Sequence, residues 1–181
     1  YQKILDEAIN ELKEDSFKNL DLEKNKFSKK VNVVFETDLE LMFPNNYINS
    51  STERLKLYTQ LNKICELDEL NSFKLELIDR FGALPNVVVE LLNSLELRWL
   101  AAALGFDKIV LKKNILISYM MNFNSDEQKK KLDKLFDYSN LNPNSISFSQ
   151  KRLADGDRFI VKIKNIDSVS KAIKVLEDIN T

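Results

Sequence analysis

A helix stop followed at once by a helix start constrains this chain more than any other feature of its sequence. The run from Asp79 to Pro85 reads Asp-Arg-Phe-Gly-Ala-Leu-Pro. Gly82 suits the left-handed conformation that ends many helices, and Pro85 suits the first position of a helix, where its missing N–H is no loss. The run therefore predicts two consecutive helices, over residues 68–81 and 85–104.

Apolar residues repeat at helical spacing before this run. The helix predicted over residues 68–81 has an inward stripe of Leu70, Phe73, Leu77 and Phe81. Another helix is predicted over residues 50–67, where Ser50 and Glu53 have the spacing of a capping box. Its apolar stripe includes Cys65, which we therefore expect to be a small core residue rather than a nucleophile.

Shorter segments have the patterns of strands. Residues 33–43 alternate between apolar and polar side chains, with Glu36, Asp38 and Glu40 on the polar side, which predicts a half-buried strand. Two further strand pairs are predicted, each followed by an amphipathic helix: 108–111 with 115–121 before helix 125–138, and 146–148 with 158–163 before helix 167–179. This order predicts an α+β fold in which helices pack with a small, mainly antiparallel sheet.

The composition excludes several kinds of site. The chain has no His, one Cys and three Gly, and it contains no Gly-x-x-x-x-Gly-Lys-Ser/Thr run. Histidine-based catalysis, a Cys/His zinc cluster, a disulfide framework and a phosphate-binding loop are therefore excluded. We expect this segment to be no enzyme by itself and to hold no cofactor or metal. With a single Cys and no disulfide framework, we expect a cytoplasmic protein. No apolar run approaches the ~20 residues of a membrane span.

The helix stop also belongs to an ordered series of motifs. Upstream of it lie Leu39–Pro44, with the letters LELMFP, then Tyr47-Ile48, and then 54–58, with the letters RLKLY. Together with the run Asp79–Pro85, this series resembles the C-terminal domain of the bacterial transcription-repair coupling factor family. The resemblance covers roughly residues 1–120.

The resemblance implies a function for the whole protein and a place for this segment in it. The parent would be an ATP-dependent DNA translocase, binding ATP and Mg²⁺ in its motor, that releases stalled RNA polymerase from duplex DNA at lesions and recruits nucleotide excision repair. Residues 1–30, which begin as an uncapped amphipathic helix and continue as a polar linker, would follow the second motor lobe. Residues 31–181 would be the regulatory domain, docked on a UvrB-like N-terminal module of the same chain and masking the surface that binds UvrA.

The predicted docking contact lies on the helix over residues 68–81. At ~100° per residue, Ser72, Leu75, Glu76 and Asp79 fall opposite the core stripe. Within the resemblance, Glu76 and Asp79 would meet basic side chains of the partner. A solvated helix face with one stray leucine is the simpler alternative.

A second function is compatible with part of the sequence. The lysines of the helix over residues 125–138 could bind nucleic acid and extend the track of a helicase-like motor. The net charge of −1 argues against this alternative, because domains that bind DNA on their own are usually strongly basic.

Overall fold

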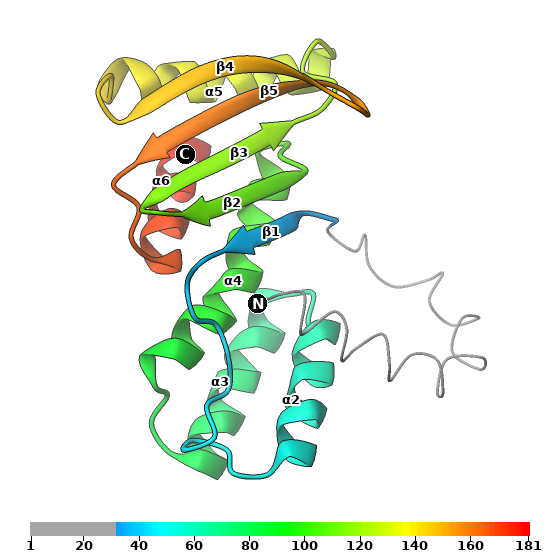
Figure 1. Ribbon diagram of the computed structural model, residues 1–181, viewed down its shortest axis with the longest axis vertical. Coiled ribbons are helices and arrows are strands. Elements are labelled where there is room, and N and C mark those ends of the chain that lie inside the picture. The colour runs from blue at the N-terminus through cyan, green and yellow to red at the C-terminus, as the bar shows by residue number, and fades with distance from the viewer. Residues whose placement is uncertain (1–31) are drawn as a thin grey trace, which may run out of the picture. The chain divides into compact units, whose positions relative to one another are not determined.

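The computed structural model describes residues 32–181 (Figure 1). The helix and linker predicted over residues 1–30 lie outside the described residues. Within the described part the chain forms two compact units, one of residues 40–92 and one of residues 32–39 with 93–181. We call them the helical unit and the sheet unit.

The helical unit contains α2 (Ser51–Lys63), α3 (Leu67–Phe81) and the first turns of α4 (Asn86–Ala103). The predicted N-cap of α2 is confirmed, since the Ser50 hydroxyl accepts a hydrogen bond from the N–H of Glu53 at 3.2 Å. The unit buries apolar side chains of all three helices and of the preceding loop: Leu41, Phe43, Ile48, Leu57, Leu61, Leu70, Phe73, Leu77, Val88, Leu91 and Leu92.

Two of the expected core residues of this unit are placed differently. Cys65 is exposed, because α2 ends at Lys63 and the extended backbone of Ile64 takes the chain out of the helical stripe. Phe81 is only half-buried, and its ring lies 5.8 Å from that of Tyr47. Both residues stand where a helix ends, so the helical period no longer determines which side faces the core.

The turn between α3 and α4 depends on Gly82 and Tyr47. Gly82 donates its N–H to the carbonyl of Ile78 at 2.9 Å and has φ 88° and ψ −167°. Glycine is required there as predicted, but its φ and ψ lie in another glycine-favoured region at positive φ rather than in the left-handed helical region. The Tyr47 hydroxyl donates to the carbonyl of Gly82 at 2.9 Å and also lies 3.2 Å from that of Leu77, so it ties the loop before α2 to the end of α3.

Gly82→Ala is expected to destabilise the helical unit by about 1–3 kcal/mol, the cost of forcing a non-glycine residue into this region of φ and ψ. A Cβ at this position would meet no atom within 4 Å, so the whole effect should come from the backbone. Urea unfolding of the variant and of the wild type measures it. A loss below about 0.5 kcal/mol would show that the turn relaxes without strain.

The sheet unit contains a five-stranded sheet of order β1-β2-β3-β5-β4. Its strands are β1 (Val34–Thr37), β2 (Lys108–Lys112), β3 (Ile115–Met120), β4 (Ile146–Leu153) and β5 (Gly156–Lys164). All neighbours are antiparallel except β1 and β2, which are parallel. The predicted α+β fold with a mainly antiparallel sheet is confirmed.

The first strand is shorter than its alternating pattern predicts. Thr37 donates its hydroxyl to the carbonyl of Leu111 at 2.8 Å and accepts the N–H of Leu39 at 3.0 Å. This local side-chain bonding draws a backbone donor away from the sheet and ends the strand at Thr37. Leu41 and Phe43 are nevertheless buried, so the expected alternation of burial continues without a strand.

One face of the sheet is covered by helices. Figure 1 shows α5 (Asp126–Leu141) and α6 (Val169–Asn180) on the far side of the strands. Both helices bury apolar side chains in the core of this unit: Leu132, Leu135, Val169, Ala172, Ile173, Leu176 and Ile179. The face toward the viewer in Figure 1 carries no helix of this unit.

Candidate docking surface on helix α3

The predicted docking residues lie on the solvent side of α3. Leu70, Phe73 and Leu77 are at most 2% exposed and face the core. Ser72 and Asp79 are exposed, and Leu75 is 68% exposed. An aliphatic side chain with two thirds of its surface in water, next to a carboxylate, is a feature of interaction surfaces as well as of ordinary helix faces.

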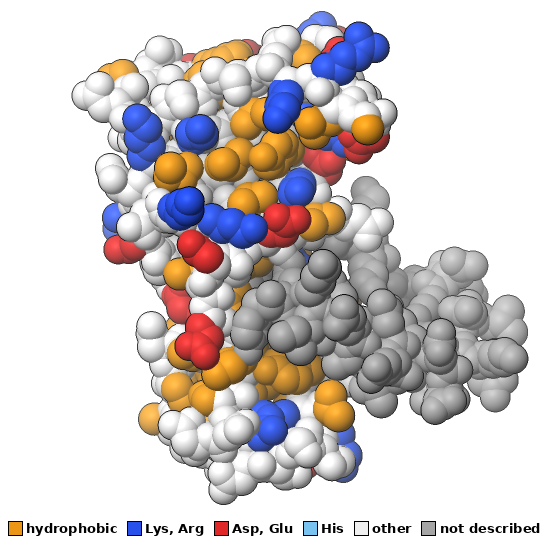
Figure 2. All heavy atoms as spheres, viewed as in Figure 1, with side chains coloured by type: hydrophobic (Ala, Val, Ile, Leu, Met, Phe, Trp, Pro, Cys, Tyr) orange, Lys and Arg blue, Asp and Glu red, His pale blue; other side chains and the backbone are white. Residues whose placement is uncertain are grey.

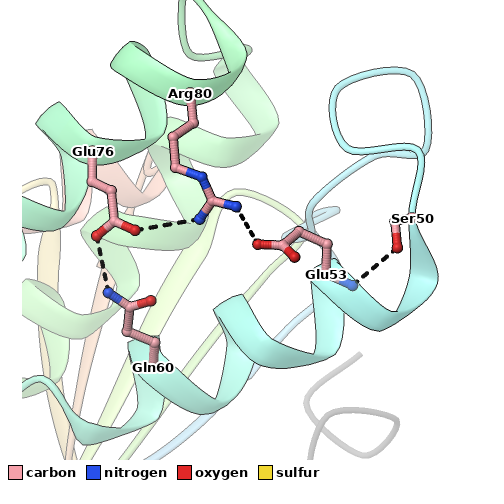
Figure 3. A network of polar contacts seen from close by, with 5 residues as sticks. All are labelled: Ser50, Glu53, Gln60, Glu76 and Arg80. Carbon is pink, nitrogen blue, oxygen red and sulfur yellow. Dashed lines mark hydrogen bonds and ion pairs between the residues drawn. The ribbon is translucent and has the colours of Figure 1, made fainter.

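Glu76 differs from its neighbours because it is already engaged within the protein (Figure 3). One carboxylate oxygen pairs with Arg80 Nη1 at 3.3 Å, and the other accepts a hydrogen bond from Gln60 of α2 at 3.1 Å. Arg80 also pairs with Glu53, the residue whose N–H is bound by the Ser50 cap. Glu76 is therefore one corner of a network that ties α3 to α2, rather than a free carboxylate.

Arg80 is shared by two carboxylates, so this network keeps one net negative charge. The hydrogen bond from Arg80, with its positive charge, holds the pKa of Glu53 below its usual value, and the bond to Glu53 raises the pKa of Arg80 in turn. The Arg80 guanidinium also lies 4.8 Å from the centre of the Phe81 ring. Because these groups are solvent-exposed, the pairs add little stability, but they hold Glu76 in one orientation.

Asp79 is the carboxylate of this surface that no other described side chain binds. Within residues 32–181, its side chain makes no ion pair and no hydrogen bond. It lies one helical turn after Glu76 and four residues after Leu75, so its charge is available to a partner that covers this side of the helix.

Sequence reasoning missed one residue of this surface. Ile78 is 44% exposed and lies three residues after Leu75, so the two form an exposed aliphatic pair on α3. The helical period could have identified Ile78, because one residue after Leu77 is a rotation of ~100° around the helix axis, which takes Ile78 out of the inward stripe. We define the α3 surface as Ser72, Leu75, Glu76, Ile78 and Asp79.

The lysine-rich helix of the second hypothesis is α5. Lys129 pairs with Asp126 at 3.7 Å and Lys131 pairs with Glu127 at 3.1 Å. Two of the three consecutive lysines therefore have acidic partners on their own helix. This pairing lowers the local positive charge that binding to phosphates would require.

The described residues also show whether a metal site or a membrane span is present. Within residues 32–181, no three His, Cys, Asp or Glu side chains lie close enough together to hold a metal ion. Over the same residues, no helix has both the length and the apolar character needed to cross a membrane.

Comparison with known proteins gives consistent matches. Residues 37–133 match the TRCF domain family. Over 160 residues the chain is 28% identical to the transcription-repair-coupling factor of Rickettsia typhi, covering 86% of this chain and 13% of that protein. Over 113 residues it is 32% identical to the factor of Haemophilus influenzae, covering 60% of this chain and 9% of that protein. The chain thus spans a small part of the length of these relatives.

A solved structure supports the fold. The crystal structure of the C-terminal domain of a transcription-repair coupling factor aligns with a TM-score of 0.58 and 14% identity, covering 82% of this chain and 92% of that one. At this identity the likeness concerns the fold alone, and the family match supplies the relationship. The chain therefore belongs to the TRCF domain family, and its fold is that of the C-terminal domain of transcription-repair coupling factor.

Proposed function

We propose that this domain is a regulatory docking domain of a transcription-repair coupling factor. It packs through the α3 surface against the UvrB-like N-terminal module of the same protein and masks the surface that binds UvrA. In this proposal the parent is an ATP-dependent DNA translocase that releases stalled RNA polymerase, and ATP and Mg²⁺ act in its motor. Engagement of the polymerase undocks the domain and opens the way for excision repair.

The observation that carries this proposal is the free Asp79 carboxylate beside an exposed aliphatic pair. Leu75 and Ile78 supply apolar area at 68% and 44% exposure, and Asp79 supplies an unneutralised charge at its edge. An apolar centre with a charged rim is the usual composition of a protein interface. The partner should therefore present an apolar patch with a basic side chain at its margin.

The network around Arg80 indicates how much each of the two carboxylates, Glu76 and Asp79, contributes to docking. Glu76 is already bound by Arg80 and Gln60, whereas Asp79 has no partner within residues 32–181, so we assign the larger electrostatic share of docking to Asp79. The network in turn holds α3 against α2, so the surface is presented by a helix of defined orientation. Such preorganisation lowers the entropy that docking must overcome.

The test compares the full-length coupling factor with a version that ends before this domain. Removal of the domain should strengthen UvrA binding at least tenfold, and addition of the 181-residue chain in trans should reverse the effect. The reversal will require a high concentration, because within one protein the linker supplies an effective concentration of order mM. Equal UvrA affinity of the two proteins would overturn the proposal.

A further inference from the structure

The open face of the sheet carries an unusual set of side chains. In a sheet with one face in water, the outward positions are normally polar. Here the outward positions of four strands include β-branched aliphatic residues at intermediate or high exposure: Val34, Val110, Ile115, Ile117 and Ile160. Figure 2 shows hydrophobic side chains gathered on this face with lysine and arginine side chains around them.

The register brings these residues into one strip. Val110 of β2 lies directly opposite Ile117 of β3, and Ile117 lies opposite Lys162 of β5. In the next row Tyr119 of β3 lies opposite Ile160 of β5. Val110 and Ile117 are close enough to touch, and Ile115 and Ile160 lie one row to either side of Ile117, so the aliphatic groups form a strip centred on Ile117.

Lysines flank the strip, and only part of their charge is neutralised. Lys108 and Lys112 both pair with Glu36, at 3.3 and 3.6 Å. Partial burial would raise the pKa of Glu36, but the hydrogen bonds and charges of the two lysines lower it. Lys162 and Lys164 are exposed and have no ion pair within residues 32–181. Glu36 pairs with two of these four lysines, so the charges of Lys162 and Lys164 stay unpaired.

Arg158 does not add to this free charge. It follows the same side of β5 but is 5% exposed, and it pairs with Asp107 at 3.5 Å and Asp155 at 2.6 Å. The unneutralised charge of the face is therefore concentrated at Lys162 and Lys164, beside Ile115 and Ile117.

The chemistry of the face distinguishes between two classes of partner. Proteins that bind single-stranded nucleic acid on a sheet stack the bases on aromatic rings. The strip contains one aromatic ring, that of Tyr119, and the Lys108 ammonium lies over this ring at 5.8 Å from its centre; the other apolar side chains of the strip are aliphatic. β-branched side chains offer no stacking surface, whereas they suit the apolar stripe of an amphipathic helix, and the free lysines suit acidic residues beside that stripe. We propose that the open sheet face docks an acidic amphipathic helix of a partner protein.

The test uses the full 181-residue chain and a synthetic probe. The probe is an 18-residue fluorescent peptide with leucines at helical spacing flanked by glutamates, and the control is a scrambled peptide of the same composition. Fluorescence anisotropy should show at least tenfold tighter binding of the amphipathic peptide. Equal binding of the two peptides would overturn the proposal, because charge alone would then explain it.

Variants locate the binding site. Lys162→Glu with Lys164→Glu should weaken binding of the amphipathic peptide at least tenfold, whereas Lys129→Glu with Lys130→Glu on α5 makes the same charge change and should leave it within twofold. Circular dichroism of both variants checks that they remain folded. Equal loss in the two variants would contradict the assignment to this face. So would displacement of the peptide by a single-stranded 20-nucleotide DNA that binds more tightly, which would assign the face to nucleic acid.

A second readout is independent of the variants. Amide chemical-shift changes on addition of the amphipathic peptide should concentrate in β2, β3 and β5. Changes confined to α5 and α6, on the other side of the sheet, would overturn the proposal.

Discussion

Leu77→Ala is expected to lower the free energy of unfolding of the helical unit by about 2–5 kcal/mol, and Leu75→Ala by less than about 0.5 kcal/mol. The two leucines are two residues apart on α3, but Leu77 is 0% exposed and Leu75 is 68% exposed. Truncation of Leu77 removes buried apolar surface and leaves a cavity in the core. Truncation of Leu75 removes atoms that are already mostly in water.

The pair is a matched control for helix propensity. Both substitutions replace leucine by alanine in the interior of the same helix, so their effects on intrinsic helix stability are the same. Urea unfolding followed by far-UV circular dichroism measures the difference. Similar losses from the two variants would mean that α3 is rotated from the orientation described, and the α3 surface would then have to be reassigned.

The local parts of the fold could be predicted from the sequence. The helix predicted over residues 68–81 is observed as Leu67–Phe81, and the cap at Ser50 is present. Both depend only on residues close together in the sequence, so the local pattern is enough to predict them. The parallel pairing of β1 with β2 could not be predicted. It joins Val34 to Lys108 across a long stretch of chain, and no local pattern specifies the partner of a strand.

The ends of helices were the weakest part of the prediction. Phe81 continues the stripe of Leu77, and as a fully buried residue its truncation to alanine would cost about 3–5 kcal/mol. In the structure it is half-buried against Tyr47, so the expected cost falls to about 2 kcal/mol. The same reason explains Cys65, which the helical period predicts in the core only if the period continues beyond the residue where α2 ends.

The α3 surface could be predicted in outline but not in its internal bonding. The helical period placed Leu75 and Asp79 outward, where the structure has them. The pairing of Glu76 with Arg80 was readable, since the two residues are four apart on one helix. The hydrogen bond from Gln60 to Glu76 could not be predicted, because Gln60 lies on another helix whose rotation depends on packing.

Because of this internal bonding, the last prediction expects different effects from the loss of Asp79 and from the loss of Glu76. In the full-length coupling factor, Asp79→Ala should weaken docking by about 2 kcal/mol or more, because loss of one partner of a desolvated charge pair typically costs 2–5 kcal/mol. Weaker docking should appear as roughly thirty-fold tighter UvrA binding and as faster ATP hydrolysis without polymerase. Neither effect should involve unfolding, since the Asp79 side chain is exposed.

Glu76→Ala should have a smaller effect on docking, below about 1 kcal/mol, because its carboxylate is already engaged by Arg80 and Gln60 and exposed pairs contribute little. The double variant should therefore resemble Asp79→Ala alone. Asp133→Ala on α5 makes the same charge change on another exposed helix and should leave UvrA affinity and basal ATPase unchanged. A larger effect from Glu76→Ala than from Asp79→Ala would mean that the Arg80 network itself meets the partner. Wild-type behaviour of both variants would place the docking contact away from α3.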